Sequence, residues 1–391
     1  MTRGEFRPRW IATIFGRCAM DRAQLIRAMQ AKAPLELAGD WDNVGLLVGE
    51  SEGELSGPVL LTIDLTDAVM DEAEAMGAGA IIAYHPPIFH PLTRVVCSDA
   101  KQRLVHRAIR SGMLIYSPHS ALDAATGGLN DWLVSAFGTG DVRALEPFSG
   151  TEARRKLVTY LPPESVDAVR HALASAGAGR IGAYELCSFG AVGEGTFLPL
   201  EGAKPVIGST GRFERVEEVR FEMVCPAEAA ALAIESIRAF HPYEEPVIDV
   251  YDLEPTPHRN AGQGRRIVLD RALTFAQIGE CVKAHLGVDR IKMATPFPDG
   301  QKLYSHIGVC AGAGHELAPL AVANGCELFL TGEMRHHEVL RYLEQGMAII
   351  LAGHTNTERG YLPELADWLR RELTGLDVRV SERDRSPLDW V

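Results

Sequence analysis

The chain has 391 residues, of which 46% are hydrophobic, so it can bury the cores of more than one globular domain. Its formal net charge of -13 argues against direct nucleic-acid binding, because affinity for a phosphate backbone comes from clustered Lys and Arg. No apolar run approaches the roughly 20 residues that cross a bilayer, which excludes a membrane-spanning helix.

Seven cysteines without a CxxC pair, and no secretory signal pattern, are typical of a reducing compartment, so we expect a cytoplasmic protein. Residues 1–19 are Arg-rich with a short apolar middle. We interpret them as a disordered leader or as residues before the natural start, which would then be Met20, because a helical pattern follows it directly. An organellar targeting segment is the alternative.

Alternating strands and helices follow from Asp21 to about residue 119. An amphipathic helix and a turn at residues 39–45 open this region. The strands are almost wholly apolar and the helices end at glycines; the strands are expected at 46–48, 58–65, 80–84 and 113–119, and the helices at 67–77 and 101–112. This pattern is typical of a mostly parallel sheet that is covered on both faces.

The middle of the chain follows a different order. Residues 154–253 show the sequence of elements β-α-β-β-α-β, which indicates a ferredoxin-like α+β module. Pro255, Pro257 and the GQG at 262–264 mark the return to the first pattern.

The first pattern returns with apolar strands at 326–332 and 348–353, a helix between them, and a long helix from about Tyr361 to Leu373. We therefore predict an α/β fold: a mostly parallel covered sheet in two halves that form one metal-binding domain, with an inserted ferredoxin-like module. The expected boundaries are 1–19 for the leader, 20–150 for the first half, 151–262 for the module and 263–391 for the second half.

Three segments place a histidine or a carboxylate just after an apolar strand. These residues are His85, Asp123, and the pair His354 and Glu358, whose i, i+4 spacing suits one face of a helix. Ligands of open parallel sheets bind at the carboxyl ends of the strands, so we expect these side chains to meet. Singly, each also fits a structural role: His85 in a turn before two prolines, Asp123 as a cap, and Glu358 at a helix start beside a surface His354.

Imidazole nitrogens and carboxylate oxygens together suit zinc, iron or manganese, and the choice among them stays open. Two of each can hold two divalent ions about 3.5–4 Å apart. We therefore predict two divalent ions per subunit, held by His85, Asp123, His354 and Glu358. Glu333 and His336 are candidates to orient these ligands, whereas we assign His337 and the turn at 241–245 structural roles.

Five motifs stand out: WDNVGLLVG (41–49), YHPPIF (84–89), SPHSALDAATGGLNDWL (117–133), LTGEMRHHEVL (330–340) and GHTNTERG (353–360). Together they resemble the NIF-three-like dinuclear-metal family, whose bacterial members are named homologues of GTP cyclohydrolase I type 2. The resemblance covers nearly the whole chain after Met20. Residues 193–211 and HPYEEPVIDVYDLE (241–254) are similar to the PII- and CutA-like module that longer members carry.

The resemblance implies a dinuclear centre held by the His of the YHP motif, the Asp of the LDA motif, and the His and Glu of the GHTNTE motif, which are His85, Asp123, His354 and Glu358. Many bacterial members have a second His where this chain has Tyr84, a form that looks like the eukaryotic branch. That departure implies a poorer ligand set for one ion. The family also implies a toroidal homohexamer whose metal sites face an internal cavity.

The resemblance further implies a metal-dependent hydrolase of the GTP cyclohydrolase type, in which a metal-bound hydroxide attacks a purine-like ring and formate is lost. His119 is the candidate for proton transfer, because an imidazole titrates near neutral pH and lies four residues before Asp123. An alternative is a metal-handling or regulatory hexamer without a dedicated activity. A third hypothesis is a protein-binding role in transcription. The substrate, a small molecule or a nucleotide, stays open.

Overall fold

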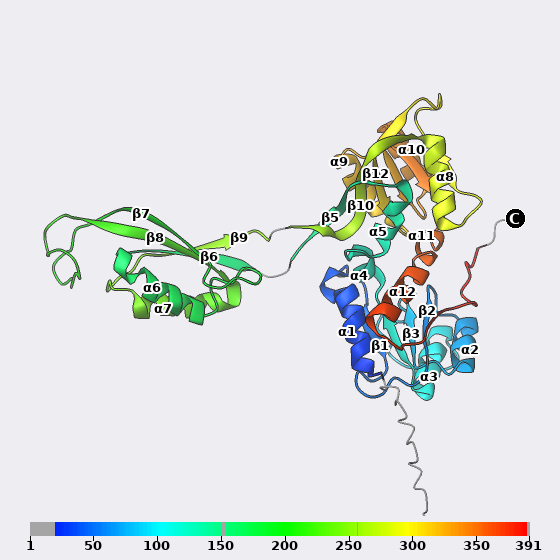
Figure 1. Ribbon diagram of the computed structural model, residues 1–391, viewed down its shortest axis with the longest axis horizontal. Helices are drawn as coiled ribbons and strands as arrows, with labels where there is room; N and C mark the ends of the chain where they lie inside the picture. Colours follow the sequence, from blue (N-terminus) through cyan, green and yellow to red (C-terminus); the bar gives the residue numbers. More distant parts are fainter. Residues whose placement is uncertain (1–19, 151–152, 256, 389–391) are drawn as a thin grey trace, which may run out of the picture. The chain divides into compact units, whose positions relative to one another are not determined.

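A computed structural model describes residues 20–150, 153–255 and 257–388, so the expected leader at 1–19 lies outside the described residues. The described chain forms two compact units (Figure 1). Unit 1 comprises the residues up to Phe148 together with those from His258 onward, and unit 2 runs from Ser149 to Pro257. We expected the inserted module at 151–262.

Unit 1 opens with α1 (Arg22–Lys32), which begins at Asp21 through a capping box with Gln24. Further α-helices in its described part are α2 (Asp67–Ala75), α3 (Ala100–Ser111), α4 (His119–Ala124), α5 (Leu129–Val134), α8 (Phe275–Leu286), α9 (Ala318–Ala323), α10 (His336–Glu344), α11 (Asn356–Arg359) and α12 (Leu362–Glu372). Short 3₁₀ turns lie at η1 (Leu35–Leu37), η2 (Ser135–Phe137) and η5 (Gly314–Leu317).

The first sheet of unit 1 has the order β1-β4-β3-β2-β15. Its strands are β1 (Gly45–Val48), β2 (Val59–Thr62), β3 (Ala80–Ala83), β4 (Leu114–Ser117) and β15 (Val378–Val380). All neighbours are parallel except β1 and β4. Successive side chains of a strand point to opposite faces, and here Leu60 and Ile81 pack with α2 and α3 while Leu61 and Ile82 pack with α1 and α12. Because helices cover both faces, the strands read as continuous apolar runs.

The second sheet of unit 1 has the order β11-β14-β13-β12-β10-β5. Its strands are β5 (Gly140–Ser149), β10 (Pro257–Thr274), β11 (Lys292–Ala294), β12 (Leu303–Cys310), β13 (Leu328–Thr331) and β14 (Ala348–Leu351). The central strands β12, β13 and β14 are parallel. β10 is antiparallel to β12, and β11 is antiparallel to β14. One apolar cluster contains residues of both sheets, so the two halves of unit 1 share a core.

A buried arginine joins the two halves. Arg265, on β10, is fully buried and binds Asp131 through Nε at 2.5 Å. Its guanidinium also donates to carbonyl oxygens on both sides of the junction: those of Gly262, Gly264 and Asn260, and those of Ala124 and Ala125. Arg265 therefore fixes the loop that follows α4 against the start of the second half.

Unit 2 contains the elements β6 (Arg154–Leu161), η3 (Pro163–Ser165), α6 (Val166–Ser175), β7 (Ser188–Phe197), β8 (Glu214–Pro226), η4 (Ala227–Ala229), α7 (Ala230–Phe240) and β9 (Ile248–Leu253). The strands form an antiparallel sheet in the order β7-β8-β6-β9, and α6 and α7 lie on one face of it (Figure 1). The core of unit 2 lies between these helices and the sheet. Across the described part of the chain, every helix is too short or too polar to cross a membrane.

Candidate metal centre

The first histidine of the site lies at the carboxyl end of the first sheet. His85 follows β3, and its backbone N–H donates to the carbonyl of Ile63 at 3.0 Å. Asp64, just beyond the end of β2, accepts a hydrogen bond from His85 Nδ1 at 3.0 Å. A carboxylate at Nδ1 fixes the tautomer and leaves Nε2 as the free nitrogen, which is the arrangement found behind metal-binding histidines.

The second sheet supplies the remaining members of the cluster. His354 follows β14, and its Nδ1 donates to Glu333 Oε1 at 2.9 Å. Glu333 follows β13, so each imidazole of the pair is oriented by a carboxylate from the neighbouring strand end. Glu358 lies one helical turn after His354 on α11, and its side chain is 2% exposed.

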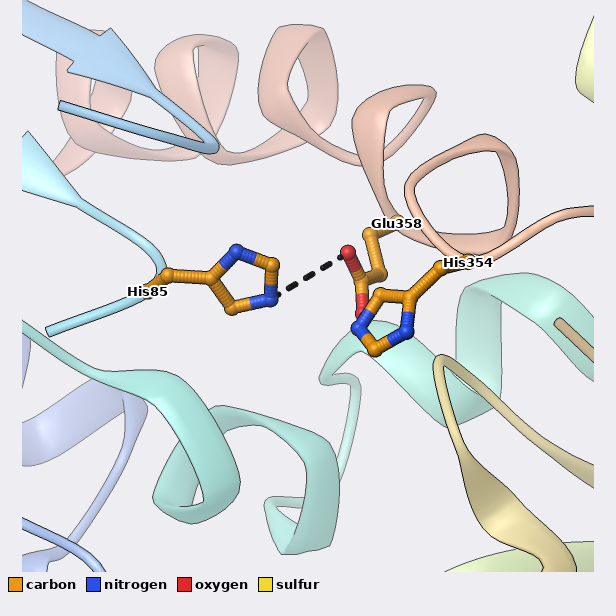
Figure 2. A group of neighbouring side chains, drawn as sticks. All are labelled: His85, His354 and Glu358. Carbon is orange, nitrogen blue, oxygen red and sulfur yellow. Dashed lines mark ion pairs between the residues drawn. The ribbon is translucent and has the colours of Figure 1, made fainter. Parts of the chain in front are cut away.

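The Glu358 carboxylate lies between the two imidazoles (Figure 2). Oε1 is 3.3 Å from Nε2 of His354, and Oε2 is 3.5 Å from Nε2 of His85. One ligand atom from each of the three residues lies within 4.8 Å of the others. Three of the four predicted ligands therefore meet, although they come from both halves of unit 1.

The cluster fits a bound cation. Oε2 of Glu358 is buried and has no hydrogen-bond partner among the residues that the structure describes. A buried carboxylate oxygen without a partner is costly, and a metal ion would satisfy it. Gly312 leaves the necessary room: a Cβ there would lie 2.7 Å from Glu358 Oε1 and 3.1 Å from His354 Nε2. Two imidazole nitrogens and one carboxylate suit a divalent zinc, iron or manganese ion.

The electrostatics of the protein without an ion also favour a cation at this point. Burial alone would lower the pKa of His85, but Asp64 and Glu358 outweigh it and raise the pKa to about 10. Glu358 raises the pKa of His354 to about 9 against the effect of burial, with Glu333 adding to the increase. Burial would raise the pKa of Glu358, yet the two imidazoles hold it below its usual value. The carboxylate is thus charged, and protons occupy the imidazoles until a metal replaces them.

Asp123, the fourth predicted ligand, lies outside this three-residue cluster. It is on α4, and its Oδ1 accepts a hydrogen bond from Tyr84 Oη at 2.6 Å. Burial raises the pKa of Asp123 to about 6, partly offset by the charge of His119 and by the Tyr84 hydrogen bond. Burial is also the main reason that the pKa of Tyr84 lies well above its usual value. The phenol is therefore a neutral donor to Asp123.

His119, the predicted proton-transfer group, forms a third histidine and carboxylate pair. Its Nδ1 donates to Asp42 at 2.8 Å, and its ring lies 5.4 Å from that of His85 between centroids. The backbone of His119 has φ +20°, at the edge of the left-handed region that residues other than glycine seldom adopt. Asp42 is held in turn by the N–H and hydroxyl of Ser120, so the imidazole is fixed through Nδ1.

Two cavities open beside the cluster, and both are lined by His85 and His354. One, of about 620 Å³, includes Asp64, Glu333 and Asn356 among its lining residues. The other, of about 560 Å³, includes His119, Phe89 and Lys101. A small molecule could therefore approach the three imidazoles from the second cavity.

Sequence reasoning missed Asp64 and Asp42 as orienting groups. The apolar pattern predicts a strand at 58–65 that includes Asp64, but β2 ends at Thr62, so this carboxylate lies beyond the strand end in the same way as His85. That position was the signal that could have identified it. His336 and His337, at the start of α10, are exposed, and the structure gives neither a contact with the cluster.

A family model described as Duf34/NIF3 (NGG1p interacting factor 3) matches residues 20–387. A relative from Mycobacterium leprae, named GTP cyclohydrolase 1 type 2 homolog, is 37% identical over 361 residues, or 92% of each chain. Human NIF3-like protein 1 is 33% identical and covers 96% of this chain, with 94% of its own length aligned. A Bacillus cereus structure described as related to NIF3 is similar with a TM-score of 0.65 at 31% identity, covering 95% of this chain and 100% of that one.

Proposed function

This chain belongs to the Duf34/NIF3 family, and on that premise we propose that it is a metal-dependent hydrolase of the cyclohydrolase type that acts on a purine-like ring. The observation that carries the proposal is the buried Glu358 carboxylate between two imidazoles, whose Oε2 has no hydrogen bond among the described residues and lies 3.5 Å from His85 Nε2. A divalent cation among these three groups would replace the imidazole protons and would satisfy that oxygen. His85, His354 and Glu358 would hold that cation.

A divalent ion at this position would act as a Lewis acid and would lower the pKa of water toward neutrality. The residues around it perform the other tasks. Asp64 and Glu333 keep both imidazoles aimed at one point. His119, held by Asp42, lines the same cavity as His85 and is the candidate general acid and base.

Two exposed aromatic side chains favour the proposal that the substrate is a planar ring. Trp41 is 62% exposed and Phe89 is 40% exposed, although both are large apolar groups. Their ring centroids lie 6.2 Å apart, and the Trp41 ring lies 5.9 Å from that of His119. A purine-like ring that stacked on them would lie beside the imidazole that moves the proton. Stacking of a base on an aromatic side chain contributes about 1–3 kcal/mol, so Trp41→Ala should weaken binding roughly 5- to 150-fold.

The test has two parts on one preparation. Elemental analysis of the purified protein should find a divalent metal, and Glu358→Ala should lose it while His337→Ala, a change of an exposed histidine, should retain it. The metal-loaded protein is then assayed against GTP and other purine nucleotides for formate release. Turnover that His354→Ala abolishes supports the enzyme. Metal content in Glu358→Ala equal to that of the wild type would refute the ligand assignment.

A metal-handling role is the second candidate. The side chain of His354 is 36% exposed and that of its partner Glu333 is 60% exposed, so an ion in the cluster would be open to solvent and to exchange. Isotope exchange of bound metal within minutes, together with no turnover across the nucleotide panel, would favour this role over the hydrolase.

We also propose that the chain assembles as a homohexamer and that unit 2 is the PII- and CutA-like module of the family. Its antiparallel strand order β7-β8-β6-β9, with both helices on one face, supports a ferredoxin-like fold for this module. Large apolar side chains of unit 2 are exposed on its edge strands, including Phe189 and Val192 on β7 and Val250 and Tyr251 on β9. Exposed apolar strand edges are typical of surfaces that pair with another copy. Light scattering of the full chain measures the assembly, and a monomer would refute it.

A further inference from the structure

Tyr84 occupies the position from which a ligand of a second ion is expected. Tyr84 lies at the end of β3, directly before His85, and it is 2% exposed. Its backbone is fixed at both polar groups: its N–H donates to the carbonyl of Thr62 at 2.9 Å, and its carbonyl accepts from Ser117 Oγ at 2.8 Å. The ring is therefore held rigidly inside the site.

The Tyr84 side chain is directed at the carboxylate that a second ion would need. Its ring lies 5.0 Å from that of His85 and 5.3 Å from that of His119 between centroids, and its hydroxyl donates to Asp123 Oδ1. Asp123 is also fixed through its backbone, because Asn130 Nδ2 donates to its carbonyl at 3.1 Å. The Tyr84 phenol and the Asp123 carboxylate thus form a hydrogen-bonded pair.

The donor set around Asp123 does not fit a second divalent ion. A phenol whose hydroxyl is hydrogen-bonded to a carboxylate is a much weaker ligand than an imidazole at the same position. Asp123 also falls outside the group of ligand atoms that lie within 4.8 Å of one another. A second ion would also meet the electrostatic repulsion of the first.

We propose that this chain binds one divalent ion, held by His85, His354 and Glu358, and that the hydrogen-bonded pair of Tyr84 and Asp123 replaces the second ion of a dinuclear centre. This inference rests on the proposed metal centre and deepens it. In this arrangement Asp123 positions Tyr84 and does not bind metal. Residue 84 decides how many ions the site takes.

The experiment measures metal stoichiometry in the full chain. The protein is stripped with chelator and equilibrated with Mn²⁺, which has little affinity for the free thiols, and bound metal is measured by elemental analysis after equilibrium dialysis. The wild type should bind about one ion per chain, whereas Tyr84→His should bind about two, because an added imidazole restores a ligand and releases Asp123. Tyr84→Phe is the matched control: it releases Asp123 without adding a ligand and should stay near one.

A second variant keeps the inference testable if Tyr84→His does not fold. Asp123→Asn should leave the stoichiometry of the wild type unchanged, because Asp123 is not a ligand, whereas a dinuclear site would lose an ion. Two tightly bound ions in the wild type, or the loss of an ion in Asp123→Asn, would overturn the inference and leave the metal centre standing. No bound ion in the wild type would refute the proposed function itself.

Discussion

Histidines in the two units differ in what their ring nitrogens contact. In unit 1, three imidazoles each donate from Nδ1 to a carboxylate; these are His85, His119 and His354. Nε2 of His85 and Nε2 of His354 both face the Glu358 carboxylate. In unit 2, His241 is buried, and its Nε2 donates to the carbonyl of Tyr160 at 3.0 Å while its Nδ1 accepts from the N–H of Tyr243 at 3.1 Å. A histidine with both nitrogens bound to backbone holds a turn, whereas one that is oriented by a carboxylate at Nδ1 can offer Nε2 to a ligand.

Charged side chains in the two units differ in how deeply they are buried. Unit 1 buries charge, both at Glu358 and at Arg265. The ion pairs of unit 2, such as Arg215 with Glu194 and Arg155 with Asp252, have mostly exposed side chains. Since water screens exposed pairs and cannot replace buried ones, the charges of unit 1 should govern stability and function far more than those of unit 2.

The largest expected effect comes from the buried arginine. Arg265→Ala removes one partner of a buried ion pair and leaves several carbonyls without donors, so the free energy of unfolding should fall by about 3–5 kcal/mol. Arg215→Ala, in an exposed pair of unit 2, should cost less than about 1 kcal/mol. Urea unfolding of both variants measures the difference. Similar losses in the two variants would remove the contrast between the units.

The next largest effect is expected when a carboxylate that orients a metal-binding histidine is substituted. Asp64→Asn keeps the size of the side chain but loses the charge that fixes His85, so metal affinity should fall about 10- to 100-fold. His241→Gln in unit 2 is the control and should leave the affinity unchanged. Titration with Mn²⁺ in a calorimeter gives both values. An unchanged affinity in Asp64→Asn would mean that the carboxylate does not support the ligand.

The local rules of the sequence explain why much of unit 1 was predictable. Apolar runs bounded by glycine identified β2, β3, β4, β13 and β14, and the rule that sites form at carboxyl ends of strands selected His85, His354 and Glu358. The same reasoning listed Asp123 beside them. Its hydrogen bond with Tyr84 depends on a contact between residues 39 positions apart, which no local pattern reveals.

The antiparallel members of the second sheet were not predictable for a related reason. β10 and β11 carry polar residues and flank the parallel strands, so their pairing depends on tertiary contacts rather than on their own composition. The buried Arg265 shows the same limit. In the sequence it is one of two adjacent arginines, and its burial follows from the carbonyls that converge on it from both halves of unit 1.

The two units should respond to pH in opposite directions, beginning with unit 1. In metal-free protein, the pKa of His85 is about 10 when folded and about 6.5 when unfolded. Its stabilisation is complete below pH 6.5 and is lost as pH rises toward 10, at up to about 1.4 kcal/mol per pH unit. His354 should add a smaller loss because it is partly exposed. Thermal unfolding at pH 7 and 9 checks this, and added Mn²⁺ should remove the decline, since a metal binds the deprotonated imidazoles.

The smallest expected effect belongs to His241. Burial lowers its pKa, against the hydrogen bond to Tyr160, so the unfolded chain binds a proton more readily than the folded one. Stability should therefore fall as pH drops below about 6.5, by less than about 1 kcal/mol at pH 5.5. Comparing the wild type with His241→Gln at pH 7.5 and pH 5.5 isolates this contribution, because glutamine does not titrate. If both proteins lost the same stability on acidification, the burial of His241 would not penalise its protonation, and the predicted contrast with the histidines of unit 1 would be wrong.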